Sequence, residues 1–311
     1  MGGNINMGMI SDLFGYLLNA LYNMFNNYGI AIIVFSLLLR VMLLPITFSQ
    51  QKSMKKNEKI QAKLKEIQKK YKNNPEKLNQ ETMELYKSEK MSPFSGCLSG
   101  IIQIVLILSV FWLVSQPLTH MRHVQNMSIY QEYINKIKEK ENKVSYIEIA
   151  VINNASTDYK EIENSLKNEE IENKEELENK KSELSNLILN MNFLGLDLSK
   201  VPTQSLEDFR VYIIPLLYVI SSFLSIKLTS NLQKGQKKDI AEKKQEGSSE
   251  LDAMQDATKF MPYMILVTSV SIAFIAPLGL ALYWLVSNIL MILERIIIQK
   301  IVDSKEENEN A

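Results

Sequence analysis

One charged residue inside an apolar stretch is the feature of this sequence with the clearest chemical consequence. Arg40 lies about ten residues from either end of the apolar run 28–48. An arginine at the centre of a membrane helix costs about 2.5–3.5 kcal/mol on insertion scales, so its guanidinium must be solvated. Arg40 could extend along the helix to the membrane surface, or it could face a wet cavity between helices.

The distribution of acidic residues favours the wet cavity. The five longest apolar runs contain no Asp or Glu before Glu294, which stands near the end of the last run. Arg40 therefore has no fixed counter-ion at its own depth that the sequence can identify. A proton or ion pump would pair such an arginine with a carboxylate, whereas a site that receives a carboxylate from another molecule would leave it open.

The same apolar runs carry hydroxyl and amide side chains at helical spacing. Each one alone could bond its own backbone or a neighbouring helix. Together with Arg40 they indicate a hydrophilic groove within the helices. These side chains are Ser36, Gln103, Ser221, Ser222, Ser225, Thr229, Thr268, Ser271, Ser287 and Asn288.

The sequence shows no catalytic centre, so we expect neither an enzyme nor a bound cofactor. Cys97 is the only cysteine, which excludes an internal disulfide. His120 and His123 could supply two metal ligands, but no third ligand is evident, and solvated histidines at the membrane interface are the simpler reading. No phosphate-binding loop or nucleophile elbow occurs in or beside the apolar runs.

The elements that position Arg40 are five apolar runs read as membrane spans, so the predicted fold is an all-α polytopic membrane protein. The predicted spans are 28–48, 98–116, 209–227, 260–275 and 278–298. Pro277 and Gly279 break the last two apart into a tight hairpin. The run 9–25 has the period of an amphipathic helix in the membrane interface.

The polar segments between the spans set the orientation. Segment 50–92 holds twelve lysines against six glutamates and divides at Asn73-Asn74-Pro75, which predicts a basic helical hairpin. Segment 117–208 has eleven basic and seventeen acidic residues, and 161–185 within it reads as a solvated or partly disordered helix. Because basic loops face the cytoplasm, the hairpin, the loop 228–259 and the tail 299–311 are predicted inside, with the N-terminus outside.

Four stretches resemble the YidC/Oxa/Alb family of membrane insertases, in its five-span bacterial form. They are YGIAIIVFSLLLRVMLLPITFSQ (28–50), SMKKNEKIQAKLKEIQKKYKNNPEKLNQETMELYKSEKMSPFSGCLSGIIQ (53–103), NFLGLDLS (192–199) and APLGLALYWLVSNIL (276–290). The chain departs from the family pattern at Ser225, where related bacterial members often have glutamine, and in its longer and more charged segment 117–208.

The resemblance implies a five-transmembrane-helix insertase core in the bacterial cytoplasmic membrane, with a hydrophilic groove open to lipid and to the cytoplasm. The family arginine matches Arg40 and would attract acidic residues of an incoming segment. The other groove residues implied are Ser36, Gln103, Ser225, Tyr283 and Trp284. The implied partners are nascent membrane proteins and the lipid bilayer, with the Sec translocon and the ribosome as further candidates.

Two other functions stay open. A small-solute transporter would also need a polar cavity, but it should show carboxylates or broken helices in repeated halves, and the sequence has no internal repeat. A membrane-anchored adaptor acting through the hairpin and segment 117–208 would make Arg40 dispensable.

Overall fold

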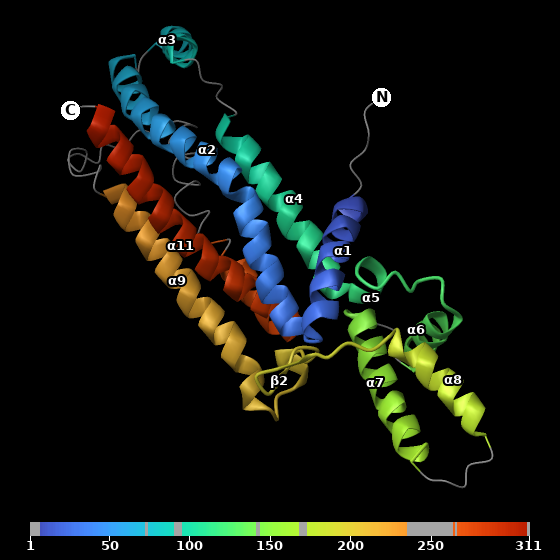
Figure 1. The fold of residues 1–311 in the computed structure, drawn as a ribbon. Coiled ribbons are helices and arrows are strands. Elements are labelled where there is room, and N and C mark those ends of the chain that lie inside the picture. The colour runs from blue at the N-terminus through green and yellow to red at the C-terminus, as the bar shows by residue number, and fades with distance from the viewer. Residues whose placement is uncertain are drawn as a thin grey trace. The chain divides into compact units, whose positions relative to one another are not determined.

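The computed structural model describes residues 7–71, 74–89, 95–140, 144–167, 173–234, 264 and 266–309, and helices dominate them (Figure 1). The chain divides into two compact units, Met1–Leu37 with Val110–Leu290 and Leu38–Ser109 with Met291–Ala311. Three described segments are long and apolar enough to cross a membrane, namely Tyr28–Gln50, Phe209–Leu228 and Leu278–Ile298. An all-α membrane protein is therefore confirmed, while the five-span core stays a prediction.

The other two predicted spans correspond to shorter apolar stretches among the described residues. Helix α4 (Ser95–Ser115) contains most of the predicted span 98–116, and its apolar described part is Ile104–Ser115. The helical segment Leu266–Ile275 belongs to the predicted span 260–275, of which residues 260–263 lie outside the described part.

Helix α2 (Tyr28–Lys70) is longer than the sequence predicts. It runs for 43 residues through Pro45 and joins the predicted span 28–48 to the first arm of the basic hairpin without a break. Helix α3 (Pro75–Ser88) forms the second arm, and its start is the predicted turn, where the Asn74 side chain accepts a hydrogen bond from the Lys77 N–H. Asn73 lies outside the described residues.

Most of the described residues of segment 117–208 lie in helices. Helices α5 (Pro117–His120), α6 (Ser128–Lys140), α7 (Ile147–Ser165) and α8 (Lys174–Ser185) carry it, and α7 packs against both α6 and α8 (Figure 1). Helix α8 fits the solvated helix predicted within 161–185, because Leu184 is its only buried residue. Leu184 and Ile162 of α7 supply the buried apolar side chains of this part.

Glu148 fastens α7 to α5 from a position that is 2% exposed. Its Oε2 accepts hydrogen bonds from the backbone N–H groups of Leu118 (2.7 Å) and Thr119 (3.0 Å), and its Oε1 accepts from the Thr119 hydroxyl and from the Tyr130 hydroxyl at 3.0 Å. These bonds satisfy donors at the start of α5 that the helix itself leaves unpaired. Burial and the nearby Glu148 charge raise the pKa of Tyr130 to about 12.

Helix α1 (Met7–Phe25) has one buried and one exposed apolar face. Its buried face approaches α5 so closely that a Cβ on Gly15 would lie 1.7 Å from the His120 carbonyl oxygen. Its ring contact with α2 joins Phe14 to Phe35, whose centroids lie 5.9 Å apart. The exposed large side chains are Met9, Leu13, Tyr16, Met24 and Phe25. An apolar face without cover fits the predicted amphipathic helix 9–25, and its place in the membrane interface stays a prediction.

A two-stranded hairpin follows α8, with β1 (Asn192–Phe193) antiparallel to β2 (Leu196–Asp197). Its turn residues Leu194 and Gly195 have positive φ angles of 52° and 79°. Both central residues of a tight hairpin turn need this conformation, which glycine adopts without strain. Two short 3₁₀ helices, η1 (Pro202–Gln204) and η2 (Phe209–Tyr212), then lead into helix α9 (Ile213–Lys234).

Helix α11 (Leu278–Glu309) begins at the turn predicted from Pro277 and Gly279, where the Leu280 N–H donates to the Pro277 carbonyl at 2.9 Å. The predicted tail 299–311 is not separate from the last span. The helix continues from the span through Glu309, and residues 310–311 lie outside the described part.

Candidate functional site

Arg40 in α2 lies beside an acidic side chain, which corrects the expectation that it lacks a counter-ion. Its Nη1 is 3.5 Å from Oε2 of Glu294 in α11, and both residues belong to the second unit. The Arg40 side chain is 24% exposed and that of Glu294 is 6% exposed. The sequence placed Glu294 near the end of the last span, so the error concerned its depth relative to Arg40.

The hydrogen bond between Arg40 and Glu294 is long, and it uses only one of the two carboxylate oxygens of Glu294. A charge-assisted N–H to carboxylate bond is commonly about 2.7–2.9 Å long, and this one is longer. Among the described residues, Oε1 of Glu294 is buried without a hydrogen-bond partner. Arg295 follows directly and lies within electrostatic range of both charges. A long, half-satisfied ion pair can exchange one carboxylate for another more readily than a short bidentate one.

Ser36 precedes Arg40 by one turn of α2 and is 1% exposed. Its hydroxyl donates to the Ile32 carbonyl at 2.7 Å, so the backbone of its own helix accepts its hydrogen bond. Serines in membrane helices often bond in this way. Gln103 lies on α4, and its side chain is outside the described residues.

A polar cluster that the predicted site omits joins α9 to α11. The Asn288 side-chain amide donates to the hydroxyls of Ser221 (2.9 Å) and Ser222 (3.1 Å), and all three side chains are buried. Ser225 is buried one turn further along α9. Their spacing predicts polar faces on the two helices, but periodicity within one helix does not indicate that these residues bond to one another.

The aromatic candidates lie on α11 in the same unit. Tyr283 is buried, and Trp284 is partly exposed with its ring centroid 6.1 Å from that of Tyr218 in α9. Of the six predicted site residues, Ser36, Ser225, Tyr283 and Trp284 belong to the first unit, and Arg40 and Gln103 to the second. The predicted site as a whole therefore stays a prediction.

Segment 190–200 fastens the starts of two spans, which gives a physical role to the family-like stretch NFLGLDLS. The Tyr28 N–H at the start of α2 donates to the Asn190 carbonyl at 3.0 Å, and a Cβ on Gly29 would lie 2.5 Å from the Phe193 ring. At the start of α11, the Gly279 N–H donates to the Leu198 carbonyl at 2.9 Å. These contacts fix the ends of α2 and α11 on one peptide segment.

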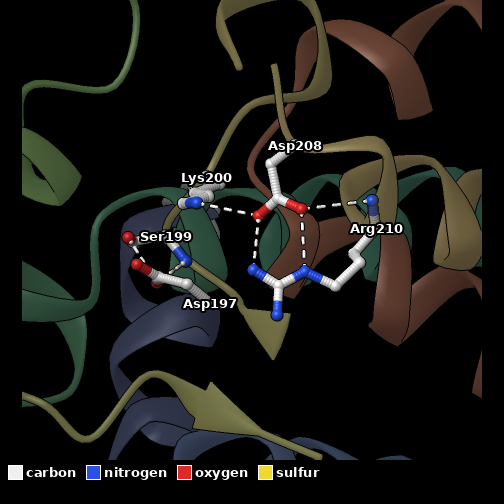
Figure 2. A network of polar contacts seen from close by, with 5 residues as sticks. All are labelled: Asp197, Ser199, Lys200, Asp208 and Arg210. Carbon is white, nitrogen blue, oxygen red and sulfur yellow. Dashed lines mark hydrogen bonds and ion pairs between the residues drawn. The ribbon is translucent and has the colours of Figure 1, made fainter. Parts of the chain in front are cut away.

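Hydrogen bonds to Asp197 and Asp208 stabilise the segment 197–210 that leads to α9 (Figure 2). Asp208 accepts from Lys200 Nζ at 3.0 Å and from Arg210 Nε at 2.8 Å and Nη2 at 3.1 Å. Beside it, Oδ1 of Asp197 accepts from the backbone N–H and hydroxyl of Ser199 at 3.0 and 2.6 Å. The hydrogen bonds from Arg210 and then Lys200 hold the pKa of Asp208 well below its usual range.

The two histidines are not the solvated pair that the sequence predicts. His120 is 9% exposed, and its Nδ1 lies 2.7 Å from Oδ1 of Asp12 in α1. His123 is exposed and packs its ring on Tyr16, with centroids 4.6 Å apart. No group of three or more His, Cys, Asp or Glu suited to a metal occurs among the described residues.

The chain is similar to known membrane proteins over nearly its whole length. The model of the family described as 60Kd inner membrane protein matches residues 20–306. Proteins named membrane protein insertase YidC match shorter parts. That of Caldanaerobacter subterraneus subsp. tengcongensis is 41% identical over 105 residues, which is 34% of this chain and 51% of the relative.

Two further relatives with the same name show the same pattern. The protein of Fusobacterium nucleatum is 38% identical over 103 residues, 33% of this chain and 50% of its own length. That of Syntrophus aciditrophicus is 45% identical over 94 residues, 30% of this chain and 17% of its own length. The aligned part thus spans about half of the first two relatives and 17% of the third. The family match covers far more than half of the chain, so the chain belongs to the 60Kd inner membrane protein family, as its resemblance to the YidC/Oxa/Alb insertases predicts.

Proposed function

We propose that the chain is an insertase that moves nascent transmembrane segments into the bacterial cytoplasmic membrane. The family match carries this proposal, because the relatives that share 38–45% identity with this chain are named as membrane protein insertases. Polar side chains on apolar helices add support. The proposed groove residues are Arg40, Ser36, Gln103, Ser225, Tyr283 and Trp284.

The proposed step at Arg40 is an exchange of carboxylates. An incoming segment with an acidic tail brings its own carboxylate to the guanidinium and replaces Glu294 as the partner. Arg40 then offsets part of the cost of taking the acidic tail out of water. Burial of the apolar helix of the substrate in lipid drives insertion. It lowers the free energy by about 25 cal/mol per Å² of apolar surface taken out of water, so the step consumes no nucleotide.

The proposed orientation follows from the charges of the polar segments. The lysine-rich hairpin 50–92 lies in the cytoplasm, where the ribosome, the Sec translocon and lipid headgroups are its candidate contacts. Segment 117–208 then lies outside, and the membrane is crossed five times.

The Arg40–Glu294 pair also favours a second candidate, a small-solute transporter, because a membrane-embedded arginine paired with a carboxylate is what such a protein uses. Family membership makes insertion the better supported function. A transporter would need Glu294 for activity, whereas carboxylate exchange in an insertase needs Arg40 and tolerates Glu294→Gln.

Complementation of an insertase-depleted bacterium tests the proposal. The wild-type chain, Arg40→Ala, Arg40→Lys and Glu294→Gln are compared by insertion of a single-span protein with an acidic tail and of a matched one with a neutral tail. We expect rescue by the wild type, Arg40→Lys and Glu294→Gln, and a loss with Arg40→Ala confined to the acidic tail. Equal loss of both tails with Arg40→Ala would refute the role of Arg40, and no rescue by an expressed, membrane-inserted wild type would refute the function.

A further inference from the structure

A pocket of 730 Å³ lies in the first unit, whereas Arg40 belongs to the second. Its walls are the end of α1, one face of α7 and the stretch 188–191 that precedes β1. This volume falls within the range of about 300–1,000 Å³ that is usual for ligand pockets. Nothing in the proposed insertion step uses it.

Arg122 is the charged group of this pocket that lacks full hydrogen bonding. Its guanidinium carbon lies 4.9 Å from the centre of the Tyr22 ring, and its Nε is buried without a hydrogen-bond partner among the described residues. Burial lowers the pKa of Arg122 from its ordinary value. A buried donor of a charged group that stays unpaired costs about 1–3 kcal/mol or more, so an acceptor that reaches Nε would be favoured.

The charges of the pocket sum to one positive when Lys181, which is paired with Glu163, is counted. Lys160 lines the pocket from α7, and the two acidic lining residues already accept hydrogen bonds. Glu163 is paired with Lys181 at 3.1 Å, and Asp197 accepts two hydrogen bonds from Ser199. The two cations Arg122 and Lys160 are therefore available to an anion.

The uncharged lining suits a peptide. Asn23, Asn153 and Ser156 face the pocket with side chains that make no hydrogen bond within the part of the chain that is described. An amide side chain offers one acceptor and two donors, which match the N–H and C=O groups of a backbone. Residues 188–191 of the wall lie outside any helix or strand.

We infer that this pocket binds an acidic segment of polypeptide on the side of the membrane where segment 117–208 lies, with the carboxylate on Arg122 and Lys160. The inference rests on the proposed function, because the segment would be the hydrophilic tail of an inserted protein. Capture of the tail beyond the membrane would oppose its return through the groove.

Binding can be measured on the purified full chain in detergent, apart from any insertion. The probe is a fluorescein-labelled eight-residue peptide with three aspartates, and the reference is the same peptide with three asparagines. Because a hydrogen bond to a charged group contributes about 1.5–3 kcal/mol, we expect the aspartate peptide to bind at least about tenfold more tightly. Equal binding of the two peptides would overturn the inference.

Three variants and one control locate the site. Arg122→Gln and Lys160→Gln should each weaken binding of the aspartate peptide, and Asn153→Asp should weaken it by placing a carboxylate in the pocket. Lys138→Gln removes an exposed cation from α6, outside the pocket, and should leave binding unchanged. Since Lys160 and Asn153 substitutions affect surface positions, they keep the test valid if Arg122→Gln fails to fold. A loss with Lys138→Gln as large as with Lys160→Gln would indicate general charge attraction and overturn the site.

A lipid headgroup is the other anion that could fill the pocket. The competitor is vesicles of phosphatidylglycerol. The assignment to a peptide would be overturned if these vesicles displaced the aspartate peptide from the wild type and Asn153→Asp did not change the affinity for the peptide. The proposed function and the peptide site have separate tests. The Arg40→Ala variant should not insert proteins with acidic tails, yet it should bind the peptide as the wild type does. Binding without insertion by the wild type would sink the insertase and keep the pocket.

Discussion

Nη1 of Arg40 and Oε2 of Glu294 lie 3.5 Å apart across α2 and α11, although 254 residues separate them in the chain. The pair gives Arg40, whose side chain is 24% exposed, an acidic partner within its apolar stretch. In the proposed carboxylate exchange, an incoming carboxylate would have to bind Arg40 better than Glu294 does.

A double-mutant cycle should detect this coupling. Arg40→Ala leaves the Glu294 carboxylate buried without this partner, and we expect a loss of about 1–3 kcal/mol of stability, below the 3–5 kcal/mol of a fully buried pair because Arg40 is 24% exposed. Adding Glu294→Gln should restore part of that loss. The measurement is thermal unfolding in detergent.

The exposed pair Lys63–Glu89, at 2.6 Å, serves as the control cycle. Its coupling should be at most about 1 kcal/mol, because solvent screens surface ion pairs. Additive effects of Arg40→Ala and Glu294→Gln would show that the two groups do not interact in the membrane.

Gly15→Ala should disrupt the contact of α1 with α5. The added methyl carbon would lie 1.7 Å from the His120 carbonyl oxygen, so the backbones must separate. We expect a loss of about 1–3 kcal/mol, the usual cost of forcing extra volume into a packed contact. Ala20→Ser on the exposed side of α1 is the matched control, and its midpoint of thermal unfolding should match that of the wild type. A Gly15→Ala variant as stable as Ala20→Ser would contradict this packing.

Glu148→Leu should be among the most damaging substitutions in segment 117–208. It removes the acceptor for four donors, from Leu118, Thr119 and Tyr130, and leaves them buried. The expected loss is about 3–5 kcal/mol, measured by chemical unfolding, and Glu148→Gln should lose less because it keeps one oxygen. Glu132→Gln on the exposed face of α6 should change stability by no more than about 0.5 kcal/mol.

Low pH should weaken the hydrogen bonds that Asp208, at the start of η2, accepts from Lys200 and Arg210. Its pKa in the folded protein is depressed by Arg210 and Lys200, so its contribution to stability is complete above the ordinary value of about 3.9 and is lost as the pH falls through the lower folded pKa. We expect the unfolding temperature to drop more steeply below about pH 4 in the wild type than in Asp208→Asn. Lys200→Gln should give an intermediate slope, and identical slopes for all three proteins would exclude this role.

The parts of the fold that follow from local sequence were predictable. Arg40 was identifiable because its burial is costly wherever its helix packs, and the start of α3 was identifiable because Asn74 and Pro75 act within one turn. The family-like stretch 192–199 can be recognised from the sequence, but its role cannot, since the bonds of Asn190 to Tyr28 and of Leu198 to Gly279 join distant segments.

Contacts between distant segments explain what the sequence missed. Whether Glu294 reaches the depth of Arg40 depends on how far α11 slides along α2, which periodicity does not encode. The Asp12–His120 pair joins residues 108 positions apart. In 161–185 the buried apolar residues Ile162 and Leu184 are sparse among charges, so composition alone does not reveal that they are buried.

The unbroken helix α2 also sets a reach. Forty-three residues at about 1.5 Å each give a rod of about 65 Å, roughly twice the 30 Å of a hydrocarbon core. The distance between two residues of one helix varies less than the distance between two residues joined by a loop. If the proposed insertion step holds, a polypeptide that docks on the lysine-rich end of α2 would start within about one helix length of Arg40, and this distance would set how far its first acidic residue must travel to the guanidinium.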